Sequence, residues 1–176
     1  MAIGSYIIRT YSSDDFDKYL RLQVESEQLE PTGHLVSAQR LSEDLGRPGF
    51  RPQEDLFVAE FKAKLVGYLR ITLEPGIQRA LLEGAVHPRH RRRGIATKLF
   101  SYSMQRVKES GVNAAQISVS EHNTPAKSLL TKLECVFIRN FFEMRLDIDN
   151  IQPRAPRRDS ITSRRLKQQE EKLLTE

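Results

Sequence analysis

Cysteine, tryptophan and long apolar runs are what this chain most lacks. Cys135 is the single cysteine among 176 residues, and tryptophan does not occur. One cysteine excludes an intrachain disulfide and a metal site built from a cysteine cluster, and the expected compartment is a reducing, cytoplasmic one. No run of about 18 apolar residues predicts a membrane span. The N-terminus has no basic segment followed by an apolar one, so we expect neither a secretory signal peptide nor a membrane partner.

Charged residues are informative here by their position. The formal net charge is +5, and the chain before residue 151 is close to neutral except at residues 87–93, which hold four arginines and two histidines. A nucleic-acid surface would be broader than this cluster, so the predicted partner is one small polyanion; nucleic acid bound by the basic tail at 151–176 is the weaker alternative. The histidines have no acidic residue at metal-ligand spacing, so no metal is predicted.

Hydrophobic residues, 39% of the chain, recur in runs that alternate between strand and helix periodicity. Strands are predicted at 6–11, 55–61, 65–73, 80–86 and 115–119, with two more between 136 and 147. Helices are predicted from an N-cap at 13–15 to about residue 28, and at 37–45, 94–109 and 124–133. About seven strands and four helices in this order predict an α/β domain over residues 1–150. Gly84, inside one predicted strand, marks a bulge or a close approach of two backbones.

Residues 151–176 differ in composition from the chain before them. Two prolines and a basic run precede a polar, weakly helical segment. We interpret this segment as a solvated basic tail, or as the opening strand and helix of a truncated second copy of the domain. In the second interpretation, the apolar side chains of the tail would lie exposed unless another surface covers them. A homodimer formed through the tail would supply that surface.

The segment from Glu83 to Thr97 carries the strongest chemical signal. It combines a strand, a short loop rich in arginine and the start of a helix. A helix N-terminus offers unpaired N–H groups and a partial positive charge. Small residues at Gly94 and Ala96 let the backbone approach a ligand closely, and the arginines add full charges. The combination predicts a phosphate site that needs neither lysine nor metal, and its spacing matches neither the nucleotide-triphosphate loop nor the dinucleotide fingerprint.

This segment resembles the coenzyme A loop of the Gcn5-related N-acetyltransferase (GNAT) superfamily. The family pattern is a strand, V-x-P and then [QR]-x-x-G-x-[GA] opening a helix; here it is Val86-His87-Pro88 followed by Arg91 to Ala96. A second family element, N-x-x-A-x-x-L, is matched by Asn123, Ala126 and Leu129. The order of the predicted elements also fits, from residue 5 to about residue 149.

The resemblance implies a fold, a cofactor and a reaction. The fold is a central mixed, mostly antiparallel sheet of about seven strands flanked by about four helices. The co-substrate is acetyl-CoA, whose acetyl group passes to an unknown amine by direct attack. The residues implied to bind coenzyme A are Val86, through its backbone, Arg91, Arg92, Arg93, Gly94, Ile95, Ala96 and Thr97 at the pyrophosphate, and Asn123 and Ala126 on the other side of the pantetheine arm.

Glu83 is the candidate catalytic residue. A carboxylate among apolar strand residues has either a partner or a raised pKa, and the second would suit a general base acting through water. The alternative is a half-exposed strand residue paired with an arginine.

Two positions depart from the family pattern: Leu130 stands in place of a thiol-protonating tyrosine, and Glu134 in place of a glycine that commonly takes a positive φ. The alternative to an N-acetyltransferase is therefore a non-catalytic acyl-CoA-binding module, half of a tandem protein.

Overall fold

The computed structural model describes residues 6–31, 33, 35–142 and 144. These residues fall into two units that divide after Val136. The described strands are β1 (Ile7–Thr10), β2 (Leu56–Phe61), β3 (Lys64–Glu74), β4 (Arg79–Val86) and β5 (Ala114–Ile117). The described helices are α1 (Phe16–Leu29), α2 (Ala38–Leu45), α3 (Pro52–Asp55), α4 (Ile95–Glu109) and α5 (Thr124–Lys132), with short 3₁₀ turns at Ser13–Asp15, Pro75–Ile77 and Pro88–His90.

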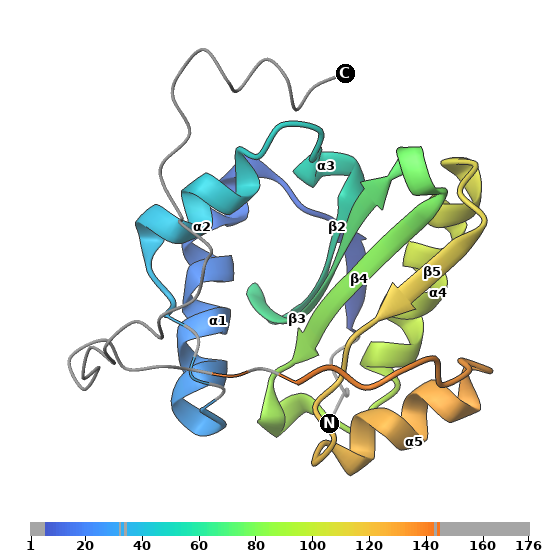
Figure 1. Cartoon of the computed structure of the whole chain (residues 1–176). Coiled ribbons are helices and arrows are strands. Elements are labelled where there is room, and N and C mark those ends of the chain that lie inside the picture. Colours follow the sequence, from blue (N-terminus) through green and yellow to red (C-terminus); the bar gives the residue numbers. More distant parts are fainter. Residues whose placement is uncertain (1–5, 32, 34, 143, 145–176) are drawn as a thin grey trace, which may run out of the picture. The chain divides into compact units, whose positions relative to one another are not determined.

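The strands form one sheet in the order β1-β2-β3-β4-β5 (Figure 1). The first three neighbouring pairs are antiparallel, and β4 pairs with β5 in parallel. A parallel neighbour needs a crossover connection, and α4 supplies it between β4 and β5. The sheet is therefore mixed, as predicted.

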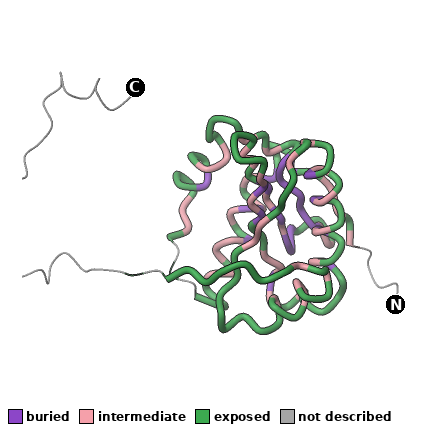
Figure 2. The backbone as a smooth tube through the Cα atoms, turned by 45° about the vertical axis from the view of Figure 1, so that its right-hand side comes forward, coloured by how far each residue is buried: buried purple, intermediate pink, exposed green. Residues whose placement is uncertain are grey.

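Each face of the sheet carries its own apolar cluster, because successive strand residues point to opposite faces. On one face, α1 and α2 bury a cluster that includes Tyr19, Leu22 and Leu41 against β2. On the other, Ile95 and Leu99 of α4 pack against inward residues of β2, β3 and β4. Figure 2 shows the buried residues gathered in the strands and on the inner sides of helices. None of the described helices is long and apolar enough to span a bilayer.

Gly84 lies where two backbones come close. A Cβ at this position would sit 2.6 Å from the carbonyl oxygen of Tyr68 on β3. A side chain of any size would therefore push β3 and β4 apart, which confirms the close approach predicted for this glycine.

The number of strands is not the predicted one: the described sheet has five, not seven. Of the segment predicted to hold two further strands, residues 136–142 and 144 lie outside any strand, and 143 and 145–147 lie outside the described residues. The alternating apolar pattern records strand propensity, but a strand also needs a paired neighbour and a covered face. Phe142, for example, is 89% exposed. The four-residue helix α3, which begins at Pro52, was not predicted because it is too short to show a period.

Candidate functional site

The candidate site begins where β4 and β5 stop pairing. The parallel pairing ends at Leu82 and Ile117, whereas β4 continues to Val86. Its other edge stays paired with β3, up to Gly67 opposite Val86. Among the described residues no strand pairs with 83–86 on the β5 side, so main-chain groups on that edge are available to an extended ligand, apart from the Val86 carbonyl, which accepts from Arg91.

Beyond Val86 the chain enters the arginine-rich turn and then α4. Gly94 is the N-cap residue of α4, with φ 76°, and no side chain caps the helix. The first N–H groups of a helix have no intrahelical partner, so those of Ile95, Ala96 and Thr97 face outward with the positive end of the helix dipole. A Cβ at Gly94 would meet no atom within 4 Å. The predicted phosphate site is therefore open and uncapped.

The four arginines of the turn have different surroundings. The Arg91 guanidinium donates from Nε to the Val86 carbonyl at 2.9 Å, and from Nη1 and Nη2 to the two carboxylate oxygens of Glu30, each at 2.7 Å. This bidentate ion pair lowers the pKa of Glu30. Arg93 donates from Nη1 to the hydroxyl of Tyr6 at 2.5 Å. Arg92 is exposed, and no partner for its side chain lies within the described part of the chain. Arg89 is also exposed, and its side chain likewise has no partner among the described residues, so the charges of Arg89 and Arg92 are the ones free for a ligand.

Two histidines brace the same turn. His87 is buried; its Nδ1 accepts from the backbone N–H of Arg89 at 3.2 Å, and its Nε2 lies 3.5 Å from a carboxylate oxygen of Glu25 on α1. His90 has Nδ1 3.4 Å from the hydroxyl of Tyr6. Burial lowers the pKa of His90, and His87 and a nearby arginine lower it further. Both rings hold the turn against the body of the domain.

Glu83 has a partner. It lies opposite Arg70 in the β3–β4 register, and Nη2 of Arg70 donates to Oε2 of Glu83 at 2.6 Å. The Glu83 side chain is 60% exposed and that of Arg70 is 19% exposed. The Arg70 guanidinium also lies 5.9 Å from the ring centroid of Phe50. The structure therefore agrees with the alternative interpretation, in which Glu83 is a partly exposed strand residue paired with an arginine.

Two tyrosines lie close to this ion pair. Tyr68, two residues before Arg70 on β3, packs edge to face on Tyr19 of α1, with ring centroids 5.0 Å apart. Burial raises the pKa of Tyr68 well above its usual value, and the Glu83 carboxylate adds to the rise. The tyrosines are thus neutral, and the charges that act on them include those of Arg70 and Glu83.

The start and end of α5 have well-defined caps. Asn123 accepts from the backbone N–H of Ala126 at 3.1 Å and is the N-cap of the helix. At the other end, the N–H groups of Glu134 and Cys135 bond the carbonyls of Thr131 and Leu130, which is the Schellman pattern. Glu134 has φ 62°. It therefore takes the left-handed conformation expected of the glycine that it replaces.

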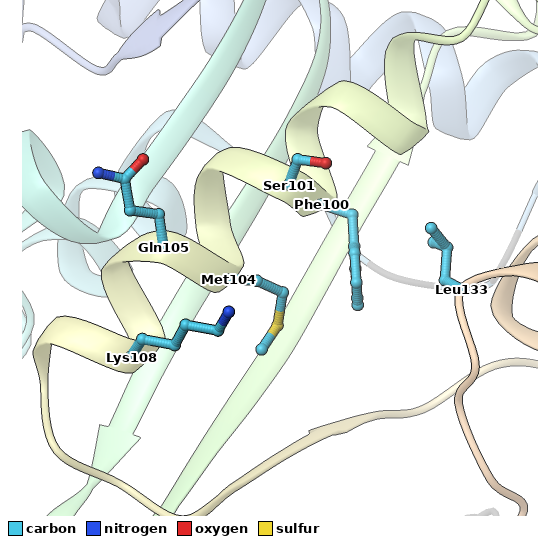
Figure 3. A pocket seen from close by; sticks show the side chains of 6 residues that line it. All are labelled: Phe100, Ser101, Met104, Gln105, Lys108 and Leu133. Carbon is cyan, nitrogen blue, oxygen red and sulfur yellow. The ribbon is translucent and has the colours of Figure 1, made fainter.

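A separate open pocket lies along the outer side of α4 (Figure 3). It is lined by Phe100, Ser101, Met104, Gln105, Lys108 and Leu133. Leu133, at the end of α5, lies across from Phe100 in this view. None of the predicted site residues lines this pocket, so it is not the predicted site.

Sequence reasoning missed Arg70 and Glu30. Arg70 carried a weak signal, as a single cation within an apolar strand, but its pairing with Glu83 depends on the strand register. Glu30 ends α1 and meets Arg91 across 61 positions of sequence, a contact that no local pattern contains.

Comparison with known proteins gives a family. The model of the acetyltransferase (GNAT) family matches residues 16–134, and the chain therefore belongs to this family. The resemblance seen in the Val86–Ala96 segment is confirmed. No curated protein is found to be similar to the chain.

Solved structures of acetyltransferases share the fold at low identity. A GCN5-related N-acetyltransferase from Sphaerobacter thermophilus is 18% identical with a TM-score of 0.63; the match covers 73% of this chain but 42% of that one. The aminoglycoside N-acetyltransferase AAC(6')-Iy, solved with CoA, is 20% identical with a TM-score of 0.63, over 81% of this chain and 95% of that one. Diaminobutyrate acetyltransferase EctA from Paenibacillus lautus is 20% identical with a TM-score of 0.61, over 74% and 75%.

Proposed function

We propose that the protein transfers an acetyl group from acetyl-CoA to the nitrogen of an amine, by direct attack within a ternary complex. The observation that carries this proposal is the unpaired edge of β4 at 83–86, which leads into the uncapped N-terminus of α4. An extended pantetheine arm suits a strand edge with free main-chain groups. A pyrophosphate suits a helix N-terminus beside arginine.

The residues of this segment would divide the cofactor between them. Val86 would bind the pantetheine arm through its backbone. The N–H groups from Gly94 to Thr97, including those of Ile95 and Ala96, would bind the pyrophosphate, and the free Arg92 would add a full charge. Arg91 and Arg93 would act through their backbones and their field, since their side chains bind Glu30 and Tyr6. Asn123 and Ala126, at the start of α5, would line the other side of the arm.

The reaction needs an unprotonated amine and a leaving thiolate that gains a proton. The amine nitrogen forms a bond to the carbonyl carbon, the carbon–sulfur bond breaks, and the sulfur leaves with the electron pair. We assign Glu83 as the base that takes the proton of the amine, directly or through water. Leu130 cannot donate a proton to the thiolate, so we assign that proton to solvent.

The change Gly94→Glu tests the cofactor site. We expect it to abolish coenzyme A binding, because a carboxylate would enter the open space at the α4 N-terminus and repel phosphate. The left-handed φ makes any side chain here cost on the order of 1 kcal/mol. Gly111→Glu is the matched control, since Gly111 has φ +75° against +76° for Gly94 and equally open space, but follows the C-terminal end of α4. Calorimetry with coenzyme A measures both variants, and unchanged affinity in Gly94→Glu would contradict the assignment.

The second candidate function is a non-catalytic acyl-CoA-binding module, half of a tandem protein. Leu130, half-buried on α5 where a proton donor is expected, favours it. Turnover of acetyl-CoA with a panel of amines separates the two functions. Intact coenzyme A binding without turnover of any amine supports the binding module.

A further inference from the structure

We propose that the acceptor is a zwitterion: an amine that also carries a carboxylate, which Arg70 binds while Glu83 receives the amine. This inference rests on the proposed function and names the class of its acceptor. It makes Arg70 a specificity-determining residue of the reaction.

Arg70 has more donors than partners. A guanidinium carries five N–H donors, yet among the described residues Arg70 makes one hydrogen bond, from Nη2 to Glu83. Its Nε is buried without a partner. Phe50 contacts the guanidinium face but accepts no conventional hydrogen bond. Buried polar groups in folded proteins are nearly always paired, so this cation is under-satisfied in the free protein.

A second unpaired polar atom lies on the same side of the sheet. The Oγ of Ser26 on α1 is also buried without a partner. Ser26 follows Tyr19 by seven positions, two helical turns, and so shares the stripe of α1 that holds Tyr19 and Leu22 against the sheet. The face of the sheet that carries Arg70 and Glu83 therefore has unused hydrogen-bonding capacity, at the Arg70 Nε and at the Ser26 hydroxyl.

Charge balance decides what kind of acceptor this face accepts. An amine arrives at neutral pH as an ammonium ion and pairs with the exposed Glu83 carboxylate. Arg70, 19% exposed, would then share or lose its counter-ion, and an unpaired buried cation is costly. An acceptor with its own carboxylate exchanges the Arg70–Glu83 pair for two pairs, ammonium with Glu83 and carboxylate with Arg70. Arginine also binds carboxylates through two parallel hydrogen bonds. Because Arg70 uses one donor for Glu83, it has donors left for such a pair of bonds.

The test uses acceptors that differ by the carboxylate alone. Ornithine is compared with 1,4-diaminobutane, and phenylalanine with 2-phenylethylamine, as acceptors with acetyl-CoA. We expect the wild-type protein to prefer the carboxylated member of at least one pair by about 10-fold or more in kcat/KM. Arg70→Gln should reduce this preference to within about 3-fold, through KM of the carboxylated acceptor, with coenzyme A affinity unchanged.

The matched control is Arg79→Gln. Arg79 is the first residue of β4, is 23% exposed and pairs with a glutamate, Glu74, as Arg70 does with Glu83, but it lies before Glu83 along the strand and away from Val86. The Arg79→Gln variant should leave the preference for the carboxylated acceptor unchanged. Arg70→Lys, which keeps the charge, should retain part of the preference that Arg70→Gln loses. The quantity compared between variants is the ratio of kcat/KM for the acceptor with a carboxylate to kcat/KM for the acceptor without one. This comparison cancels the difference in amine basicity within each pair.

Two results of the acceptor comparison would overturn this inference, and a third would do so before the comparison is made. One is an equal or reversed preference in the wild-type protein for both pairs; the other is the same preference in Arg70→Gln as in Arg79→Gln. Coenzyme A binding with no acetylation of either carboxylated compound also counts against it, while the cofactor assignment stands. Loss of coenzyme A binding in the wild-type protein would instead contradict the proposed function itself.

Discussion

Glu83 contributes little to the core, because its side chain is 60% exposed and held by Arg70. An ammonium group that draws the carboxylate away from Arg70 also places it beside the proton to be removed. The contact with the ammonium group would thus free the carboxylate from Arg70 and bring it to the proton.

The change Glu83→Gln isolates this charge, since glutamine keeps the shape and most of the hydrogen bonding. We expect kcat/KM to fall by about 10²-fold or more, most strongly at low pH, where the amine is protonated. Glu74→Gln, another strand glutamate paired with an arginine, is the control and should retain activity. The measurement is the pH profile of kcat/KM. Wild-type activity in Glu83→Gln from about pH 6 to 9 would leave positioning and solvent proton transfer as the mechanism.

At the scale of elements, most of the helices and strands up to residue 133 could be predicted from periodicity and caps. Ser37 was predicted to begin a helix and does so, with its side chain accepting from the N–H of Arg40. The segment after Cys135 could not be predicted, because its alternating pattern does not state whether a pairing strand is present. The phosphate loop was predictable because it is contiguous. Arg70 and Glu30 were not, since register and packing between distant elements bring them to the site.

The end of α5 carries a strained residue that a substitution can relieve. Glu134 has φ 62° in a Schellman cap, where glycine has no steric penalty. We expect Glu134→Gly to raise the free energy of unfolding by about 0.5–1 kcal/mol. Glu134→Ala is the control, because it removes the carboxylate but keeps the Cβ. Urea denaturation measures both variants, and an equal gain in Glu134→Ala would show that charge, not backbone strain, is responsible.

At the scale of the whole molecule, the chain spans 42% of the length of the Sphaerobacter protein whose fold it shares. Residues 151–176, predicted to be a basic tail or the start of a second copy, lie outside the described residues. The domain limits of 1–150 and 151–176 stay a prediction, as do a homodimer and a cytoplasmic location.

Truncation after Asn150 tests the tail. We expect the thermal midpoint and coenzyme A affinity to be unchanged, because a solvated extension buries no apolar surface. Light scattering after size exclusion compares the oligomeric state of the full chain and the truncated chain. A full-length dimer that becomes a monomer on truncation would support the second-copy interpretation and contradict the solvated tail.

Arg91 ties the end of α1 to the end of β4, through Glu30 on one side and the Val86 carbonyl on the other. If the cofactor binds at Val86 and the acceptor lies on the α1 side of the sheet, the two ligands share this link. Thermodynamic reciprocity then applies. If the bound acceptor changes the affinity for coenzyme A by some factor, through Glu30, then bound coenzyme A changes the affinity for the acceptor by the same factor. The coupling between the two ligands would then run through one guanidinium group.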